Sequence, residues 1–150
     1  MNKKRLVVAF SGPSNSGKTT AIVKVASILN DGGFKVCIIK HDPKDKAVFD
    51  REGKDSFKFS QTGADVAVVS SNRTTYFKKN TSTVDEMIDL FQDFDYLLIE
   101  GLKTLELPRI SIFRDRLDES YFNVTNAIAC DETIIFLCFV ISNNIFLNHI

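Results

Sequence analysis

Gly12-Pro13-Ser14-Asn15-Ser16-Gly17-Lys18-Thr19 is the stretch of sequence that decides the fold. In loops with this spacing, glycines let backbone N–H groups turn inward around phosphate oxygens, and the following helix adds the positive end of its dipole. Lys18 is predicted to bridge the β- and γ-phosphates of a nucleoside triphosphate, and the Thr19 hydroxyl is predicted to bind Mg²⁺. The sequence therefore predicts a phosphate-binding loop.

The segments on either side of this loop supply the context that such a loop requires. Residues 6–10 are an apolar run, as expected of a strand buried on both faces of a parallel sheet. Residues 18–30 are predicted to form a helix, because apolar residues recur at spacings of three and four, and Asp31-Gly32-Gly33 ends it. Residues 34–40 are the second predicted strand. This order predicts a right-handed crossover unit.

Strands and helices alternate along the rest of the chain. Helices are predicted at 55–61 and after Thr83, where Glu86 completes a capping-box spacing. The predicted strands are 65–70, 74–77, 95–100, 110–113, 127–130 and 134–141. The whole of 1–150 is predicted to be one domain with an α/β, three-layer P-loop NTPase fold. We expect a mainly parallel central sheet flanked by helices, with an antiparallel hairpin at its edge as a further option.

The charge composition indicates that function depends on a local site and not on the overall charge of the protein. The chain has 19 Lys and Arg and 19 Asp and Glu residues, so no net charge draws it to nucleic acid or to an anionic membrane. No run approaches the roughly 18 continuous apolar residues of a membrane span. The three cysteines sit in apolar runs without metal-ligand spacing, which is typical of reduced thiols in a cytoplasmic protein; they are Cys37, Cys130 and Cys138.

Several polar side chains are expected at the ligand-binding edge of the sheet. In open α/β sheets the ligand lies outside the carboxyl ends of the strands. Glu100 ends an apolar strand, so it is predicted to hold Mg²⁺ or to orient an attacking water, with an ordinary strand-end carboxylate as the alternative. The second strand ends in Lys40-His41-Asp42. Asp42 is suited to the metal and His41 to a phosphate or substrate, with a structural histidine as the alternative for His41.

Two further groups of charged residues have an open interpretation. Gly53-Lys54-Asp55-Ser56 indicates, on its residues alone, a helix start with surface charges. Lys103 follows Glu100 closely, and it is either a cation for an anionic ligand or a solvated side chain.

Taken together, these segments resemble one family, the molybdopterin-guanine dinucleotide biosynthesis adaptor protein B (MobB) family. The resemblance lies in GPSNSGKTT (12–20), IKHD (39–42), DREGKDS (50–56), Gly63-Ala64, DYLLIEGLK (95–103), PRISIFR (108–114) and AIACD (127–131). It implies a homodimer that binds GTP with Mg²⁺ and hydrolyses it slowly. It also implies a partner, the molybdenum cofactor guanylyltransferase, which attaches GMP to molybdopterin. Molybdopterin itself is a further candidate ligand.

The candidate site residues come from these segments, and the resemblance moves Lys54, Asp55, Ser56 and Lys103 from surface charges to the site. Thr20 joins the nucleotide-binding loop, and Lys18 and Glu100 are the candidate catalytic groups. Asp131 is the candidate for accepting guanine protons, with a helix cap as the alternative. The candidates for contact with substrate or partner are Lys40, His41, Lys54, Asp55, Ser56 and Lys103. The sequence departs from the family at Pro43-Lys44-Asp45-Lys46, where histidines are usual, and at Leu102, where a phenylalanine is usual.

Two other functions share the phosphate loop. A small-metabolite or nucleotide kinase would need an acceptor pocket and an arginine-bearing lid, for which Arg109, Arg114 and Arg116 are candidates. A nucleotide-gated chaperone that inserts metal would favour a Cys/His cluster with metal-ligand spacing, and the sequence has none.

Overall fold

The computed structural model describes residues 5–130 and 145–147. Its contacts divide the chain into two compact units. Met1–His41 with Asp93–Ile150 is the core unit, and Asp42–Gln92 is the inserted unit. The single domain expected over 1–150 stays a prediction.

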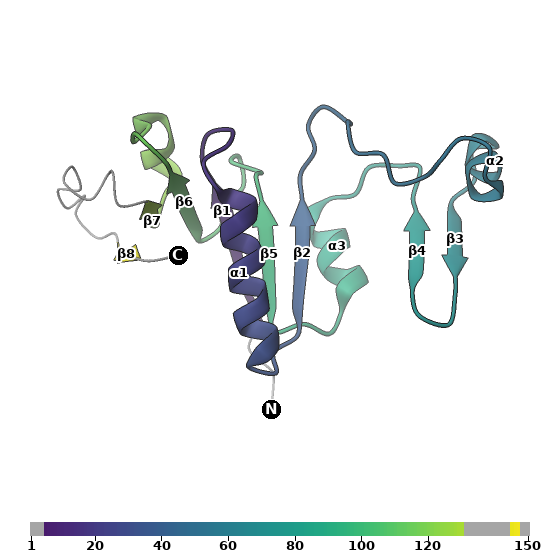
Figure 1. Cartoon of the computed structure of the whole chain (residues 1–150), viewed down its shortest axis with the longest axis horizontal. Coiled ribbons are helices and arrows are strands. Elements are labelled where there is room, and N and C mark those ends of the chain that lie inside the picture. The colour runs from purple at the N-terminus through teal and green to yellow at the C-terminus, as the bar shows by residue number, and fades with distance from the viewer. Residues whose placement is uncertain (1–4, 131–144, 148–150) are drawn as a thin grey trace. The chain divides into compact units, whose positions relative to one another are not determined.

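Within the described residues, the core unit holds a six-stranded sheet (Figure 1). The strands are ordered β2-β5-β1-β6-β7-β8, and each neighbouring pair is parallel. Their bounds are β1 (Leu6–Ser11), β2 (Val36–Lys40), β5 (Tyr96–Glu100), β6 (Arg109–Phe113), β7 (Ala127–Cys130) and β8 (Ile145–Leu147). Because the strands are parallel, the carboxyl ends of β1, β2, β5 and β6 meet at one edge of the sheet.

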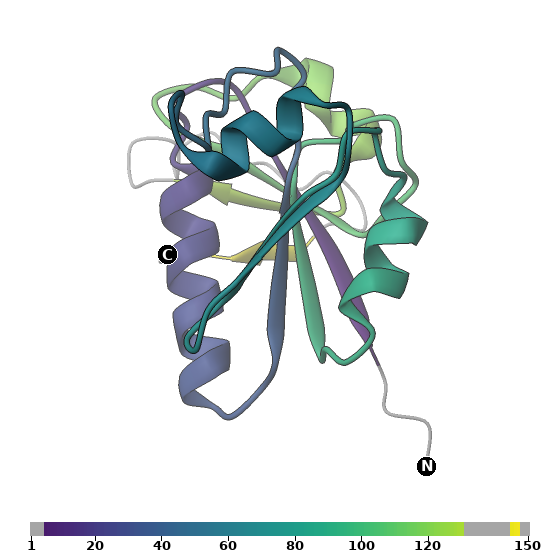
Figure 2. The same cartoon turned by 90° about the vertical axis from the view of Figure 1, so that its right-hand side faces the viewer.

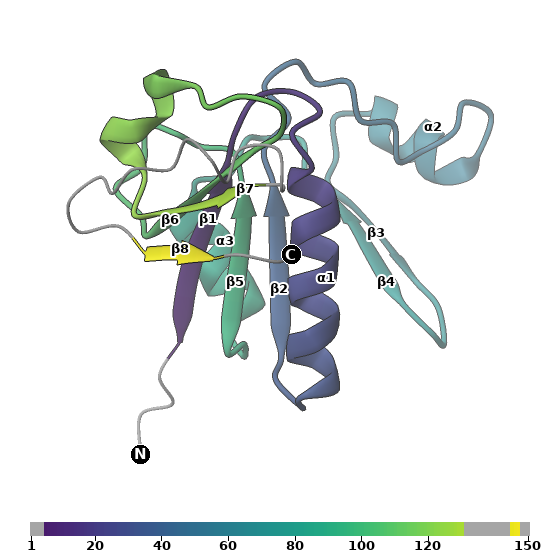
Figure 3. The ribbon, with the colours of Figure 1, turned by 60° about the vertical axis from the view of Figure 1, so that its left-hand side comes forward.

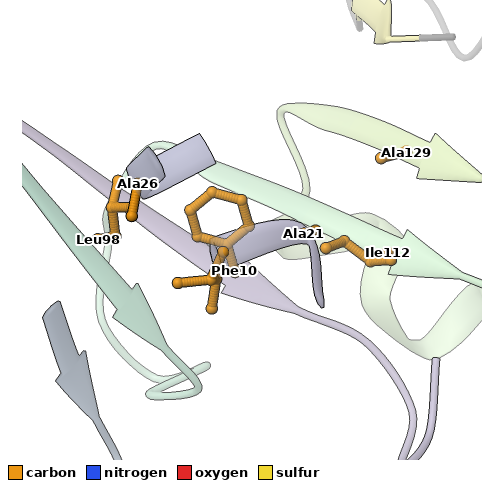
Figure 4. Close-up of a cluster of buried hydrophobic side chains, with 7 residues drawn as sticks. Phe10, Ala21, Ala26, Leu98, Ile112 and Ala129 are labelled. Atoms are coloured by element: carbon orange, nitrogen blue, oxygen red, sulfur yellow. The ribbon is translucent and has the colours of Figure 1, made fainter. Parts of the chain in front are cut away.

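Helix α1 (Lys18–Asp31) follows the phosphate loop and lies over β1, β2 and β5 (Figure 3). Ile22 and Ala26, two of the predicted apolar positions, are buried together with Ala21. These side chains belong to one core cluster with Phe10, Leu98, Ile112 and Ala129 (Figure 4). Burial of this face fixes the first turn of α1 next to the end of β1, where the loop joins them.

The connection from α1 to β2 is tied down at the edge far from the loop. Helix α1 ends at its two glycines as predicted, and Gly33 adopts a left-handed φ of 80°. Strand β2 begins at Val36, later than the predicted strand over 34–40. The backbone N–H of Lys35 donates to the Asp95 carboxylate at 2.8 Å, which anchors this connection beside the start of β5.

The inserted unit contains two helices and a hairpin, which is drawn in teal in Figure 2. Its elements are α2 (Asp55–Gln61), β3 (Val66–Val69), β4 (Thr74–Phe77) and α3 (Val84–Phe91). Strands β3 and β4 pair antiparallel. Helix α3 starts with the predicted capping box, because Thr83 Oγ1 accepts from the Glu86 N–H at 3.2 Å and the Glu86 carboxylate accepts from the Thr83 N–H at 2.9 Å.

The structure confirms the predicted fold class, an α/β fold with a mainly parallel sheet and one antiparallel hairpin. Two short elements were not predicted: the 3-10 helix η1 (Glu119–Val124) and strand β8. The predicted strand over 134–141 lies outside the described residues.

Candidate nucleotide site

The glycines of the phosphate loop adopt backbone conformations that other residues rarely adopt. Gly12 has a φ of 141°, and a Cβ built on it would lie 2.2 Å from the Ile112 carbonyl oxygen and 2.8 Å from Ser16 Oγ. Gly17 precedes α1 in the left-handed conformation at φ 94°, and Asn15 is also left-handed at φ 63°. Successive turns of this kind direct backbone N–H groups into a concavity that suits an anion.

A buried hydroxyl inside the loop fits a phosphate ligand. Ser16 is 6% exposed, and its Oγ has no hydrogen-bond partner among the described residues. A buried polar atom without a partner carries a desolvation cost that a ligand oxygen would offset. The loop residues therefore fit the polyphosphate of a nucleotide, both by the turns at Gly12 and Gly17, which have positive φ, and by this unsatisfied hydroxyl.

Lys18 reaches back over its own loop. Its Nζ donates to the carbonyl oxygens of Pro13 at 2.6 Å and of Gly12 at 3.2 Å. Desolvation by burial lowers the pKa of Lys18, while the Glu100 carboxylate raises this pKa, and the Lys40 and Lys103 cations lower it. The predicted phosphate-binding cation thus lies within the electrostatic reach of three other predicted site residues.

Two neighbouring pockets lie at the carboxyl edge of the sheet. The first, of about 400 Å³, is lined by Ser14, Asn15, Gly17, Lys18, Thr19, Thr20, Glu100 and Arg114. It contains both Thr19 and Glu100, whose hydroxyl and carboxylate are the oxygen ligands that Mg²⁺ prefers. The second, of about 100 Å³, is lined by Ser16, Gly17, Thr20, Ala21, Ile112, Phe113, Arg114, Ala129 and Cys130. Gly17, Thr20 and Arg114 are common to both pockets.

Arg114 is a candidate site residue that the sequence pattern did not place at the phosphates. It was considered only as a lid residue of a kinase, yet it lines both pockets. The signal that could have placed it is its position directly after β6, since β6 pairs with β1 and ends at the same edge of the sheet.

Glu100 lies at the junction of three strands. Lys40 Nζ lies 3.1 Å from Glu100 Oε2, and the His41 N–H donates to the Glu100 carbonyl oxygen at 3.1 Å. The His41 ring packs against the backbone of Gly101, where a Cβ would lie 3.3 Å from His41 Cβ. The structure therefore brings together Lys40, His41 and Glu100, as expected from their places at strand ends.

Lys103 and Arg109 are both occupied by contacts within the core unit. Lys103 Nζ lies 3.2 Å from the centroid of the Tyr121 ring, a cation–π contact. Arg109 is 1% exposed and donates hydrogen bonds from its guanidinium to protein oxygens. Its assignment to a kinase lid was wrong, because a lid arginine has to reach a ligand and this guanidinium is buried.

The other predicted site residues belong to the inserted unit or lie outside the described residues. The Asp42 carboxylate accepts backbone N–H groups of Lys46 at 2.7 Å and Ala47 at 2.8 Å, so it organises the turn that follows β2. The predicted partner residues Lys54, Asp55 and Ser56 stand at the start of α2, where Asp55 pairs with Lys58 and Ser56 with Asp50. Their roles at the site stay predictions. Asp131 lies outside the described residues.

The parallel sheet, the glycine-rich loop between β1 and α1, and a strand-end carboxylate in the same pocket define a protein of the P-loop NTPase class. The sequence profile of the family described as Molybdopterin guanine dinucleotide synthesis protein B (MobB) matches residues 7–135. The chain belongs to the MobB family.

Relatives in other organisms are consistent with this assignment. A protein of Methanocaldococcus jannaschii is 31% identical over 116 residues, covering 73% of this chain and 48% of the relative. The molybdopterin-guanine dinucleotide biosynthesis adapter protein of Escherichia coli is 32% identical over 116 residues, covering 73% of this chain and 66% of the relative. The chain thus spans from about half to two thirds of the length of these relatives.

The crystal structure of Bacillus subtilis MobB superimposes with a TM-score of 0.77 at 23% identity, covering 95% of this chain and 89% of that one, and this likeness shows the fold. None of the helices in the described part of the chain has the length and apolar character that a membrane span requires.

Proposed function

We propose that the phosphate loop binds a nucleoside triphosphate, GTP, together with Mg²⁺. The observation that carries this proposal is the pocket in which Lys18, Thr19 and Glu100 lie with the loop glycine Gly17. A cation, a hydroxyl and a carboxylate around one anion-binding loop are the groups that hold a triphosphate and its metal. The unsatisfied Ser16 hydroxyl supports the same ligand class.

Each residue of the proposed site has a role in binding the nucleotide or the metal. Lys18 would exchange its two carbonyl acceptors for the β- and γ-phosphate oxygens, and Thr19 and Glu100 would hold the metal, with Asp42 as a further candidate ligand. The metal ion, when bound, neutralises charge that develops on the phosphates. Glu100 also orients the attacking water. Hydrolysis is expected to be slow, well below the roughly 1–100 s⁻¹ of kinases.

The biological role follows from the family. The Escherichia coli relative is named an adapter protein of molybdopterin-guanine dinucleotide biosynthesis. We propose that this chain, as a homodimer in the cytoplasm, assists the guanylyltransferase that attaches GMP to molybdopterin. Asp131 would accept the guanine protons. Lys40, His41 and Lys103 would contact substrate or partner together with Lys54, Asp55 and Ser56, and molybdopterin is a further candidate ligand. The free thiol of Cys37 suits a reducing compartment.

A comparison of nucleotides tests the proposal. Calorimetric titration with GTP and ATP, each with and without Mg²⁺, should give tighter binding of GTP and a further gain with Mg²⁺. Tighter binding of ATP would contradict the guanine assignment and favour a kinase. A pull-down with purified guanylyltransferase then tests the adapter role, and failure to retain that enzyme in the presence of GTP would contradict it.

A further inference from the structure

Arg109 is a buried cation that the proposed nucleotide chemistry does not use. It stands at the start of β6, and 1% of its surface is exposed. Its Nη1 donates to Ser11 Oγ at 2.7 Å and to the Gly101 carbonyl oxygen at 2.9 Å. Its Nη2 donates to the carbonyl oxygens of Leu102 at 2.8 Å and Leu105 at 3.0 Å.

The guanidinium of Arg109 donates hydrogen bonds to uncharged groups. Among the described residues no carboxylate pairs with its guanidinium, and burial lowers its pKa. Burying a charge without a counter-ion costs free energy, and an apolar side chain of similar volume would avoid that cost. An apolar side chain could not, however, make the four hydrogen bonds of Arg109, so the positions of the four acceptors indicate its role.

The acceptors come from two segments that flank the candidate nucleotide site. Ser11 is the last residue of β1 and directly precedes Gly12 of the phosphate loop. The three carbonyls belong to residues 101–105, the loop that follows Glu100 and carries Lys103. This loop has a conformation that is costly without support, because Leu102, which is not a glycine, has a left-handed φ of 51°.

We propose that Arg109 is a positioning residue, which clamps the 101–105 loop against the end of β1 and so fixes Glu100 and Lys103 relative to the phosphate loop. The planar fork of a guanidinium suits this task, because it directs several donors along fixed and different directions. The proposal rests on the proposed function, since a nucleotide with Mg²⁺ gives these fixed positions their purpose.

Three substitutions separate positioning from simple packing. Arg109→Gln removes the charge and the fork, whereas Arg109→Lys keeps the charge and loses the fork. Arg116→Gln is the matched control, because Arg116 is exposed, follows the same strand and lines neither of the two pockets. The two readouts are the GTP dissociation constant with Mg²⁺ and with EDTA, and amide hydrogen exchange of the protein without nucleotide.

The proposal predicts a loss confined to the Mg²⁺-dependent part of binding. Arg109→Gln should remove about tenfold or more of the affinity that Mg²⁺ adds, the size of one charge-assisted hydrogen bond, and should speed exchange at residues 101–107. Arg109→Lys should lose about threefold, and Arg116→Gln nothing. In a Glu100→Gln background, Arg109→Gln should cause no further loss of the Mg²⁺ gain, because the group it positions is absent.

Several outcomes would overturn the proposal. The first is that in Arg109→Gln both the increase in GTP affinity caused by Mg²⁺ and the rate of amide hydrogen exchange are unchanged. The second is that Arg109→Gln loses equal GTP affinity with and without Mg²⁺ and exchanges amide hydrogens faster throughout the core unit. If Arg109→Gln does not fold, Arg109→Lys tests the proposal instead. A smaller increase in GTP affinity with Mg²⁺ and faster amide exchange at residues 101–107 would support the proposal, and no change in either would overturn it. If the wild-type protein gains no affinity from Mg²⁺, the proposed function fails; faster exchange confined to residues 101–107 then still supports the clamp, and unchanged exchange overturns it.

Discussion

Lys40 and Glu100 are register partners on the adjacent parallel strands β2 and β5, and Lys40 Nζ lies 3.1 Å from Glu100 Oε2. The Lys40 side chain is 63% exposed and the Glu100 side chain 15% exposed, so the carboxylate is the sheltered member of the pair. A cation at this distance competes with a metal ion for the same oxygens. In the proposed site, where Glu100 would hold Mg²⁺, this pair would set how strongly the carboxylate is available to the metal.

Lys40→Met should lower the Mg²⁺ concentration that half-saturates the GTP complex. Exposed ion pairs contribute about 0.2–1 kcal/mol, so a decrease of about threefold is expected. Titration of Mg²⁺ at saturating GTP measures this concentration. A higher half-saturating concentration would contradict the account, because it would mean that Lys40 holds the carboxylate in place for the metal.

Gly12→Ala should abolish nucleotide binding and destabilise the fold. The added Cβ would lie 2.2 Å from the Ile112 carbonyl oxygen at a φ that alanine rarely adopts, so a cost of about 1–3 kcal/mol in unfolding free energy is expected from backbone strain. Gly33→Ala is the control for φ alone, because its φ is also positive and a Cβ added there would have no atom of the described residues within 4 Å. Gly33→Ala should cost about 1 kcal/mol and leave the GTP dissociation constant unchanged.

Chemical unfolding and calorimetry distinguish these two glycines. Equal losses of stability in the two variants, with equal GTP affinity, would show that the close approach of Gly12 to Ile112 has no role in the loop.

Arg114→Gln should weaken GTP binding by about tenfold or more, the size of one charge-assisted hydrogen bond. Arg114 lines both pockets at the phosphate loop, so its guanidinium is in reach of an anionic ligand there. Arg116→Gln removes the same charge from a nearby exposed position and should change the affinity by less than about twofold. If both variants lose affinity equally, the effect comes from net charge and Arg114 makes no specific contact.

The affinity for GTP should decline with rising pH as Lys18 loses its proton. Burial lowers the pKa of Lys18, so the decline should come below the range of an exposed lysine. A bound phosphate favours the charged amine; affinity is therefore full below the pKa of Lys18 in the unbound protein and lost above it. Since the Glu100 carboxylate raises this pKa, Glu100→Gln should move the decline to lower pH.

Titrations of the wild type and Glu100→Gln across alkaline pH, in EDTA, measure this shift. Because both proteins meet the same ligand, the titration of the ligand itself cancels from the comparison. A decline at the same pH in both proteins would mean that Glu100 and Lys18 do not interact.

Local patterns predicted most of the elements of this fold. The strand at 74–77, the helix at 55–61 and the capping box at Thr83 are present at the predicted residues, because spacing and capping act over a few neighbouring positions. The phosphate loop also has the backbone that its glycines predicted. Short elements such as η1 carry too few residues for a periodic pattern, so they were missed.

The contacts that arrange the site could not be read from the sequence. Arg109 bonds to Ser11 across 98 positions of the chain, and its other acceptors are backbone carbonyls, which leave no trace in residue types. The strand order that places β6 beside β1 is likewise set by packing of the whole sheet. For this reason the sequence offered Arg114 only as a candidate for the lid of a kinase, whereas the structure has it lining the pockets at the phosphate loop.

Calorimetric titration of the wild-type protein and Lys18→Ala with GTP and Mg²⁺ tests the central claim most directly. Lys18 is the cation of the proposed phosphate site, and its loss removes charge-assisted hydrogen bonds to the β- and γ-phosphates. Measurable binding to the wild type and no detectable binding to Lys18→Ala are expected, with both proteins folded by circular dichroism. Binding of GTP to Lys18→Ala with the affinity of the wild type would contradict this claim.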